Sequence, residues 1–158
     1  MEQYIQPFID VTKTTFSSFV GVELTVDRPF FMEKSAANEW DISGLIGLSG
    51  EARGAMVIGL KADLAIKLTD MLTGQSHNSI DDDVADAIGE IINIIAGNAK
   101  KELEESYRLI ISLPTIVTGG GHQIKWPHNQ TRIICIPFGL FENDSFILSV
   151  AIESLKKD

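Results

Sequence analysis

The segment Ile80–Glu105, IDDDVADAIGEIINIIAGNAKKELEE, is the longest periodic stretch of the sequence and decides its fold. Apolar residues recur in it at three- and four-residue spacing, which predicts an amphipathic helix. On a wheel of about 100° per residue, the predicted buried face comprises Val84, Ile88, Ile91, Ile92, Ile95, Ala99 and Leu103. The opposite stripe comprises Asp82, Asp86, Glu90, Asn93, Gly97 and Lys101.

The start of this helix is marked by polar residues. Ser79 is the expected N-cap, and Asp81, Asp82 and Asp83 lie in the first turn, where the helix dipole favours negative charge. Inside the helix, Gly89 and Gly97 each cost roughly 1 kcal/mol relative to alanine. The close approach of another backbone would justify both glycines.

The rest of the chain alternates short helices and strands. Apolar periodicity predicts helices over 2–19 and 62–72, and Gly21 and Gly74 are the expected stops. Strands are expected over 22–26, 41–49, 52–60, 109–117 (interrupted at Pro114), 131–138 and 145–152. Gly119–Gly121 is read as a turn or loop.

The order of these elements repeats. A helix, a strand ending near proline and a hairpin occupy residues 2–60 and again 80–152, and the short helix joins the two copies. Few connections have the βαβ form. We therefore predict one domain over residues 1–158 of the α+β class: a largely antiparallel sheet with two long helices and one short helix packed on it, in a pseudo-symmetric repeat.

Composition excludes several classes of function. The 158 residues are 44% hydrophobic and 22% charged, as in ordinary globular domains, and the formal net charge is −9. An acidic surface repels phosphate backbones and anionic lipid, so neither nucleic acid nor a membrane is an expected partner. The single cysteine excludes an internal disulfide and any multi-cysteine metal site. No leader or membrane-spanning stretch is visible, so we expect a cytoplasmic protein.

Residues 87–100, AIGEIINIIAGNAK, resemble the signature of the CheC/CheX/FliY phosphatases of bacterial chemotaxis. That family carries a Glu-x-x-Asn pair on a long exposed helix, matched here by Glu90 and Asn93, and a small-residue step, matched by Ala96–Gly97. The hairpin over 44–59, the helix end at 71–74 and the strand LPTIV at 113–117 are also similar to the family pattern. The first helix has no second Glu-x-x-Asn pair, so the resemblance is closest to CheX.

This resemblance implies that the chain is a hydrolase acting on the aspartyl phosphate of a CheY-like response regulator. Asn93 would position the hydrolytic water, and Glu90 would pair with the regulator's active-site lysine. Ile94 and Gly97 would contact the partner, and Asp86 would either contact it too or be a solvated residue. The regulator would bind Mg²⁺ with its own carboxylates, so no cofactor or metal is expected on this chain. A homodimer is also implied, paired through the Pro114 region or through the strand over 131–138.

Two other readings stay open. The chain could be a non-catalytic module of the same fold that binds a regulator or a flagellar-switch component, or an unrelated structural dimer. Other chemical signals are weaker. Gly119–His122 lacks the residues of a phosphate loop, and His122 with His128 is read as a pair of surface histidines. Cys135 is expected in the core, and Asp81–Asp83 as helix-start charge.

Overall fold

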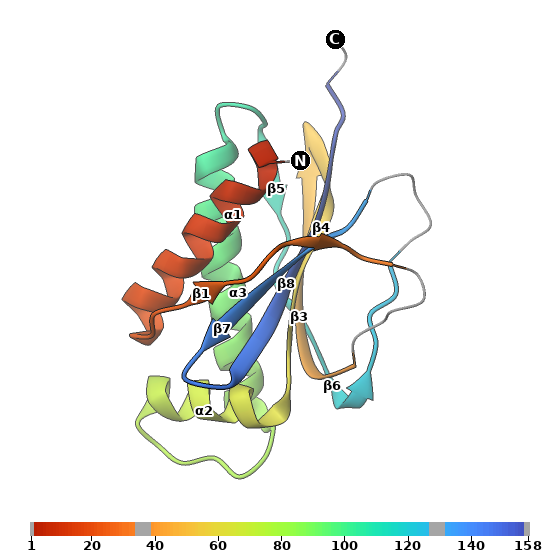
Figure 1. Cartoon of the computed structure of the whole chain (residues 1–158). Coiled ribbons are helices and arrows are strands. Elements are labelled where there is room, and N and C mark those ends of the chain that lie inside the picture. The colour runs from red at the N-terminus through yellow and green to blue at the C-terminus, as the bar shows by residue number, and fades with distance from the viewer. Residues whose placement is uncertain (1, 34–38, 127–131, 157–158) are drawn as a thin grey trace.

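The computed structural model describes residues 2–33, 39–126 and 132–156, with side chains from Ile5 onwards (Figure 1). Its helices are α1 Glu2–Thr15, continued by the π-helical turn Phe16–Val20, then α2 Ala62–Thr73 and α3 Asp82–Leu103. Its strands are β1 Thr25–Val26, β2 Phe30–Phe31, β3 Trp40–Gly50, β4 Ala52–Leu60, β5 Leu109–Ile111, β6 Thr115–His122, β7 Ile134–Leu140 and β8 Asp144–Ser154.

The strands form one antiparallel sheet in the order β1-β7-β8-β4-β3-β5, with β2 also pairing with β7 and β6 with β3. The two copies of the repeat are interleaved in this sheet. The first strands of each copy pair with the hairpin of the other copy, and β8 joins the two halves by pairing with β4. The predicted pseudo-symmetric α+β arrangement is therefore confirmed.

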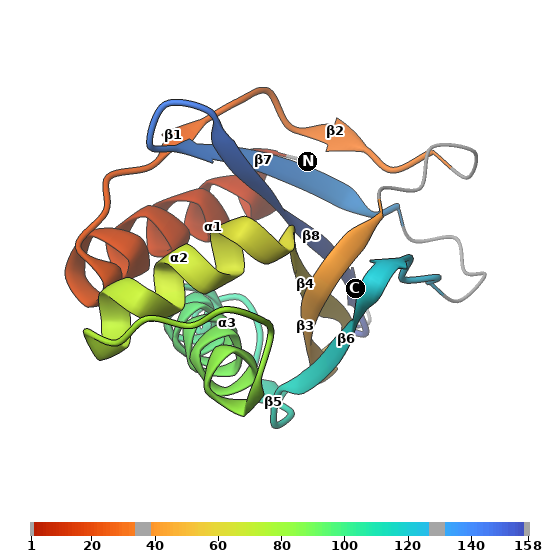
Figure 2. The same cartoon turned by 90° about the horizontal axis from the view of Figure 1, so that it is seen from below.

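All three helices lie on one face of the sheet (Figure 2). The core between the layers is continuous, and its largest side chains include three stacked rings: Phe16 with Phe146 at a centroid distance of 4.9 Å, and Phe146 with Phe138 at 5.3 Å. Both α1 and α2 contact α3. The long helix is thus wedged between two helices and the sheet, which leaves only one side of it accessible.

Helix α3 rests closely on β3 because of Gly44. A Cβ added at Gly44 would lie 3.2 Å from Cγ2 of Ile58 and 3.2 Å from Cγ2 of Ile92. The missing side chain allows Ile92, on the buried face of α3, to approach the sheet backbone. This contact fixes the height of the helix above the sheet.

Two local predictions about strands were wrong. The strand over 22–26 is only Thr25–Val26, followed by the short β2 at Phe30–Phe31. Gly119–Gly121 is not a turn, because these residues extend β6 as far as the pairing of His122 with Trp40. Glycine permits this course, since Gly119 and Gly121 have φ values of +140° and +71°.

The strand predicted over 131–138 is β7, which begins at Ile134; Thr131 lies outside the described residues. It is not a free edge, because β8 covers one side and β1 and β2 cover the other. The predicted alternative that two chains pair through this strand is therefore wrong for its described residues, because both of its sides are already paired within the chain. Among the described residues, no helix has both the length and the apolar character that crossing a bilayer requires.

Candidate active site on the long helix

Helix α3 presents the predicted site residues together on its accessible side. Asp86 and Glu90 are exposed, and Asn93, Ile94 and Gly97 are half-buried. Glu90 and Asn93 are three residues apart, which makes them surface neighbours on a helix. Within the described part of the chain, no hydrogen bond or ion pair holds either side chain. Both are therefore available to a bound partner.

The opposite face anchors this stripe. All seven residues of the predicted buried face are buried: Val84, Ile88, Ile91, Ile92, Ile95, Ala99 and Leu103. Each fully buried aliphatic side chain contributes about 1.5–3 kcal/mol relative to leaving it exposed. The polar stripe is therefore carried on a rigid support, which suits a site that must hold a geometry.

The start of α3 differs from the sequence prediction. The N-cap is Asp81 and not Ser79: the Asp81 backbone is extended, with φ −103° and ψ −171°, and its carboxylate accepts the Val84 N–H at 3.0 Å. Asp82 and Asp83 follow in the first turn, and Lys100 and Lys101 lie in the last turn. The negative charge at the start therefore compensates the helix dipole as predicted, and the two lysines do the same at the other end.

The two glycines of α3 have different surroundings. A Cβ at Gly89 would meet Ile116 at 3.6 Å and Pro114 at 3.9 Å, which are ordinary side-chain contacts. A Cβ at Gly97 would meet no heavy atom within 4 Å. The close backbone approach expected at both positions is thus absent from the described part of this chain. The space at Gly97 is open to a partner.

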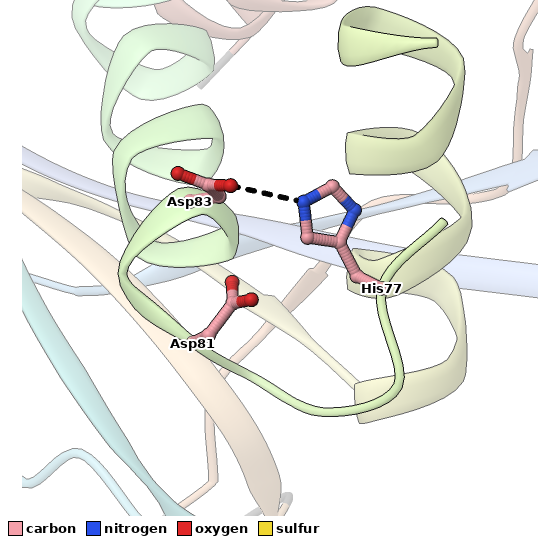
Figure 3. A group of neighbouring side chains, drawn as sticks. All are labelled: His77, Asp81 and Asp83. Carbon is pink, nitrogen blue, oxygen red and sulfur yellow. Dashed lines mark hydrogen bonds and ion pairs between the residues drawn. The ribbon is translucent and has the colours of Figure 1, made fainter. Parts of the chain in front are cut away.

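A cluster of potential metal ligands lies at the start of α3 (Figure 3). One ligand atom each from His77, Asp81 and Asp83 lies within 4.8 Å of the others. The sequence interpretation held that consecutive helical aspartates diverge. Asp81 and Asp83 nevertheless converge on His77, because Asp81 is the extended cap residue.

Hydrogen bonding accounts for this cluster without a metal. The buried His77 ring has Nδ1 2.8 Å from Asp70 Oδ1 and Nε2 3.2 Å from Asp83 Oδ2. These carboxylates, Asp70 first, raise the pKa of His77 because they favour the protonated ring. The resulting ion pairs tie the end of α2 to the start of α3. No local pattern in the sequence indicated this contact.

The remaining candidates occupy structural positions. His122 is half-buried and not a plain surface histidine: Nε2 lies 2.8 Å from Ser43 Oγ, and Nδ1 lies 2.7 Å from the Gly119 carbonyl oxygen. His128 lies outside the described residues. Cys135 is buried as predicted, and burial raises the pKa of its thiol, which disfavours a nucleophilic thiolate.

Comparison with known proteins identifies a family. The family model described as chemotaxis phosphatase CheX matches residues 42–139, which include the whole stripe of α3. The CheY-P phosphatase CheX of Thermotoga maritima is 29% identical over 112 residues, 70% of each chain. These matches confirm the predicted resemblance and the predicted class of enzyme, a phosphatase.

Solved structures agree on the fold. The CheX protein of Vibrio vulnificus superposes with a TM-score of 0.87 at 28% identity, covering 96% of this chain and 99% of that one. A Borrelia burgdorferi structure, a CheX–CheY–BeF3–Mg²⁺ complex, has a TM-score of 0.81 at 23% identity and covers 96% and 98% of the two chains.

Proposed function

This chain belongs to the chemotaxis phosphatase CheX family, and from that premise we propose that it hydrolyses the aspartyl phosphate of a CheY-like response regulator. The observation that carries the proposal is the pair Glu90 and Asn93, presented on one accessible face of a rigid helix. The family description and the relative named a CheY-P phosphatase support the substrate class.

Hydrolysis of an aspartyl phosphate requires little of the enzyme beyond positioning a water molecule and stabilising charge. An acyl phosphate already has a good leaving group, so the gain comes from placing a water in line with phosphorus and stabilising charge. The carbonyl oxygen of the Asn93 amide accepts a hydrogen bond from that water, and its NH₂ donates elsewhere. The Glu90 carboxylate pairs with the regulator's active-site lysine and fixes the register of the helix. No covalent enzyme intermediate is required.

The neighbouring residues shape the contact. Gly97 lies one turn beyond Asn93, and the open space above it lets the partner's backbone come close. Ile94 packs against the partner beside Glu90, and Asp86 lies one turn earlier at the edge of the same contact. Mg²⁺ would belong to the regulator; the Borrelia complex contains CheY, Mg²⁺ and BeF3, which stands in for the phosphoryl group.

Charge supports the choice of partner. Between Asp81 and Glu105 there are eight acidic and two basic residues, which gives −6 of the chain's −9. Such a helix favours a contact face that presents lysine, and the association should weaken as salt rises. The site of action proposed is the cytoplasm, which the single cysteine fits.

We further propose that the chain acts as a homodimer. The edge we propose for this contact is β6, since β3 pairs with one of its sides and no described strand pairs with the other. Sedimentation of the purified chain would test this, and a monomer at micromolar concentration would contradict it.

A decay assay tests the proposed activity. Each CheY-like regulator of the source organism is phosphorylated, and loss of the phosphoryl group is followed with and without the chain. Glu90→Ala and Asn93→Ala should each nearly abolish the acceleration. Glu102→Ala and Asn98→Ala, matched changes on the same helix but away from the stripe, should not. Unchanged decay with every regulator would refute the proposal, and binding without turnover would favour the non-catalytic module.

A further inference from the structure

The connection between β5 and β6 contains one residue more than the stretch of β3 that lies opposite it. Leu48 pairs with Ile111 and Leu45 pairs with Thr115, so two residues of β3 face the three residues Ser112–Pro114. An extra residue of this kind is a β-bulge, which bends a strand and redirects side chains. The bulge therefore determines where the Leu113 side chain points.

Leu113 is held in an exposed position. It is 86% exposed, more than any other large apolar side chain that the structure describes. The residue before it is fixed on β3: the Ser112 N–H donates to the Gly47 carbonyl at 2.9 Å, and Ser112 Oγ accepts the Gly47 N–H at 2.8 Å. An apolar group projected by such an anchored backbone loses little conformational entropy when a partner covers it.

The bulge lies beside the proposed catalytic helix. The side chains of Pro114 and Ile116 fill the space that Gly89 leaves, 3.9 and 3.6 Å from its absent Cβ. Gly89 is four residues before Asn93, one turn along the same side of α3. Pro114 therefore flanks the stripe on the side of Asn93, and Leu113 lies next to it along the chain.

We propose that Leu113, supported by Pro114, is a docking contact for the response regulator, and this rests on the proposed function. A regulator seated over Glu90 and Asn93 would extend across the neighbouring bulge and cover Leu113 with an apolar side chain of its own. A second copy of this chain is a poorer occupant of this face, because two acidic stripes would repel each other.

The test compares Leu113→Ala with Leu155→Ala, which removes an exposed leucine beside Glu51 at the end of the β3–β4 hairpin. Loss of an interface anchor should raise KM for the phosphorylated regulator about tenfold and leave kcat within roughly twofold, as expected for a contact present equally in ground and transition states. Leu113→Met should keep most of the affinity that Leu113→Ala loses, and Leu155→Ala should change neither KM nor kcat.

The outcomes separate the two proposals. Absence of turnover by the unmodified chain with every regulator refutes the proposed function. Turnover with an unchanged KM for Leu113→Ala refutes only the docking contact. Sedimentation of the same variant is the second readout: if Leu113→Ala dissociates a dimer while turnover per site is preserved, a second copy covers Leu113 and the proposal is overturned.

Discussion

Replacing Gly97 with alanine should make the protein more stable and less active. The added Cβ meets no heavy atom within 4 Å, and the position lies well inside α3, six residues before its last residue, Leu103. Alanine therefore adds its full helix preference, about 0.5–1 kcal/mol over glycine. For a chain of 158 residues, this corresponds to an increase in Tm of roughly 1–4 °C.

The activity should change in the opposite direction, because the open space at Gly97 is where we propose that the regulator approaches. Gly97→Ala should raise KM modestly, and Gly97→Leu should raise it further, since leucine is nearly as good a helix former but much larger. Thr14→Ala is the matched control: Thr14 is exposed on α1, away from the stripe, so the change should stabilise slightly without altering turnover.

Thermal unfolding and the decay assay, run on the same preparations, check both halves of this prediction. A lower Tm for Gly97→Ala would show that a Cβ at this position is not accommodated without a clash. Full activity of Gly97→Leu at limiting regulator concentration would show that nothing approaches Gly97 closely.

Three further predictions concern stability. Gly59→Ala places a Cβ 2.5 Å from the ring of Trp40, so denaturant unfolding should show a loss of about 1–3 kcal/mol; an unchanged midpoint would contradict this. Asp81→Ala removes the α3 N-cap and should lower the free energy of unfolding by about 1 kcal/mol, whereas Ser79→Ala should leave it almost unchanged. Equal losses in the two variants would contradict the assignment of Asp81 as the cap. His77 has a pKa raised in the folded state by its two carboxylates. Its stabilisation is therefore complete below the ordinary pKa of about 6.5 and is lost as pH rises through the raised pKa. The difference in unfolding free energy between the unmodified chain and His77→Gln should thus shrink from pH 6 to pH 9, and a difference that grows would refute the ion pair.

The sequence predicted α3 well because its signal is local. The apolar spacing is complete within the segment, so the buried face and the positions of Glu90 and Asn93 followed from the helix period alone. The cap was misplaced by two residues, since Ser79 and Asp81 are both good capping residues. Only the extended backbone at Asp81 decides between them.

The misjudged features depend on contacts between distant segments. Gly119–Gly121 looks like a turn by composition, but β3 pairs with Thr118 and His122 on either side of it, so the glycines continue the strand. His77 gave no local sign that it would lie between two carboxylates. Leu113 likewise joins the proposed docking face only through the register of β5 and β6 on β3, which periodicity cannot supply.

The position of β8 in the sheet affects how the chain can fold while it is being synthesised. It is the last strand in sequence, yet it lies between β4 and β7 and pairs with β4 from Ala52 to Gly59. A nascent chain that ends before Asp144 therefore has β4 as an open edge, and open edges recruit other strands. The pairing of β4 with β8 can form only after the last described strand has been synthesised, so α3, which carries the proposed site and precedes β8 in the chain, is translated before the sheet is complete.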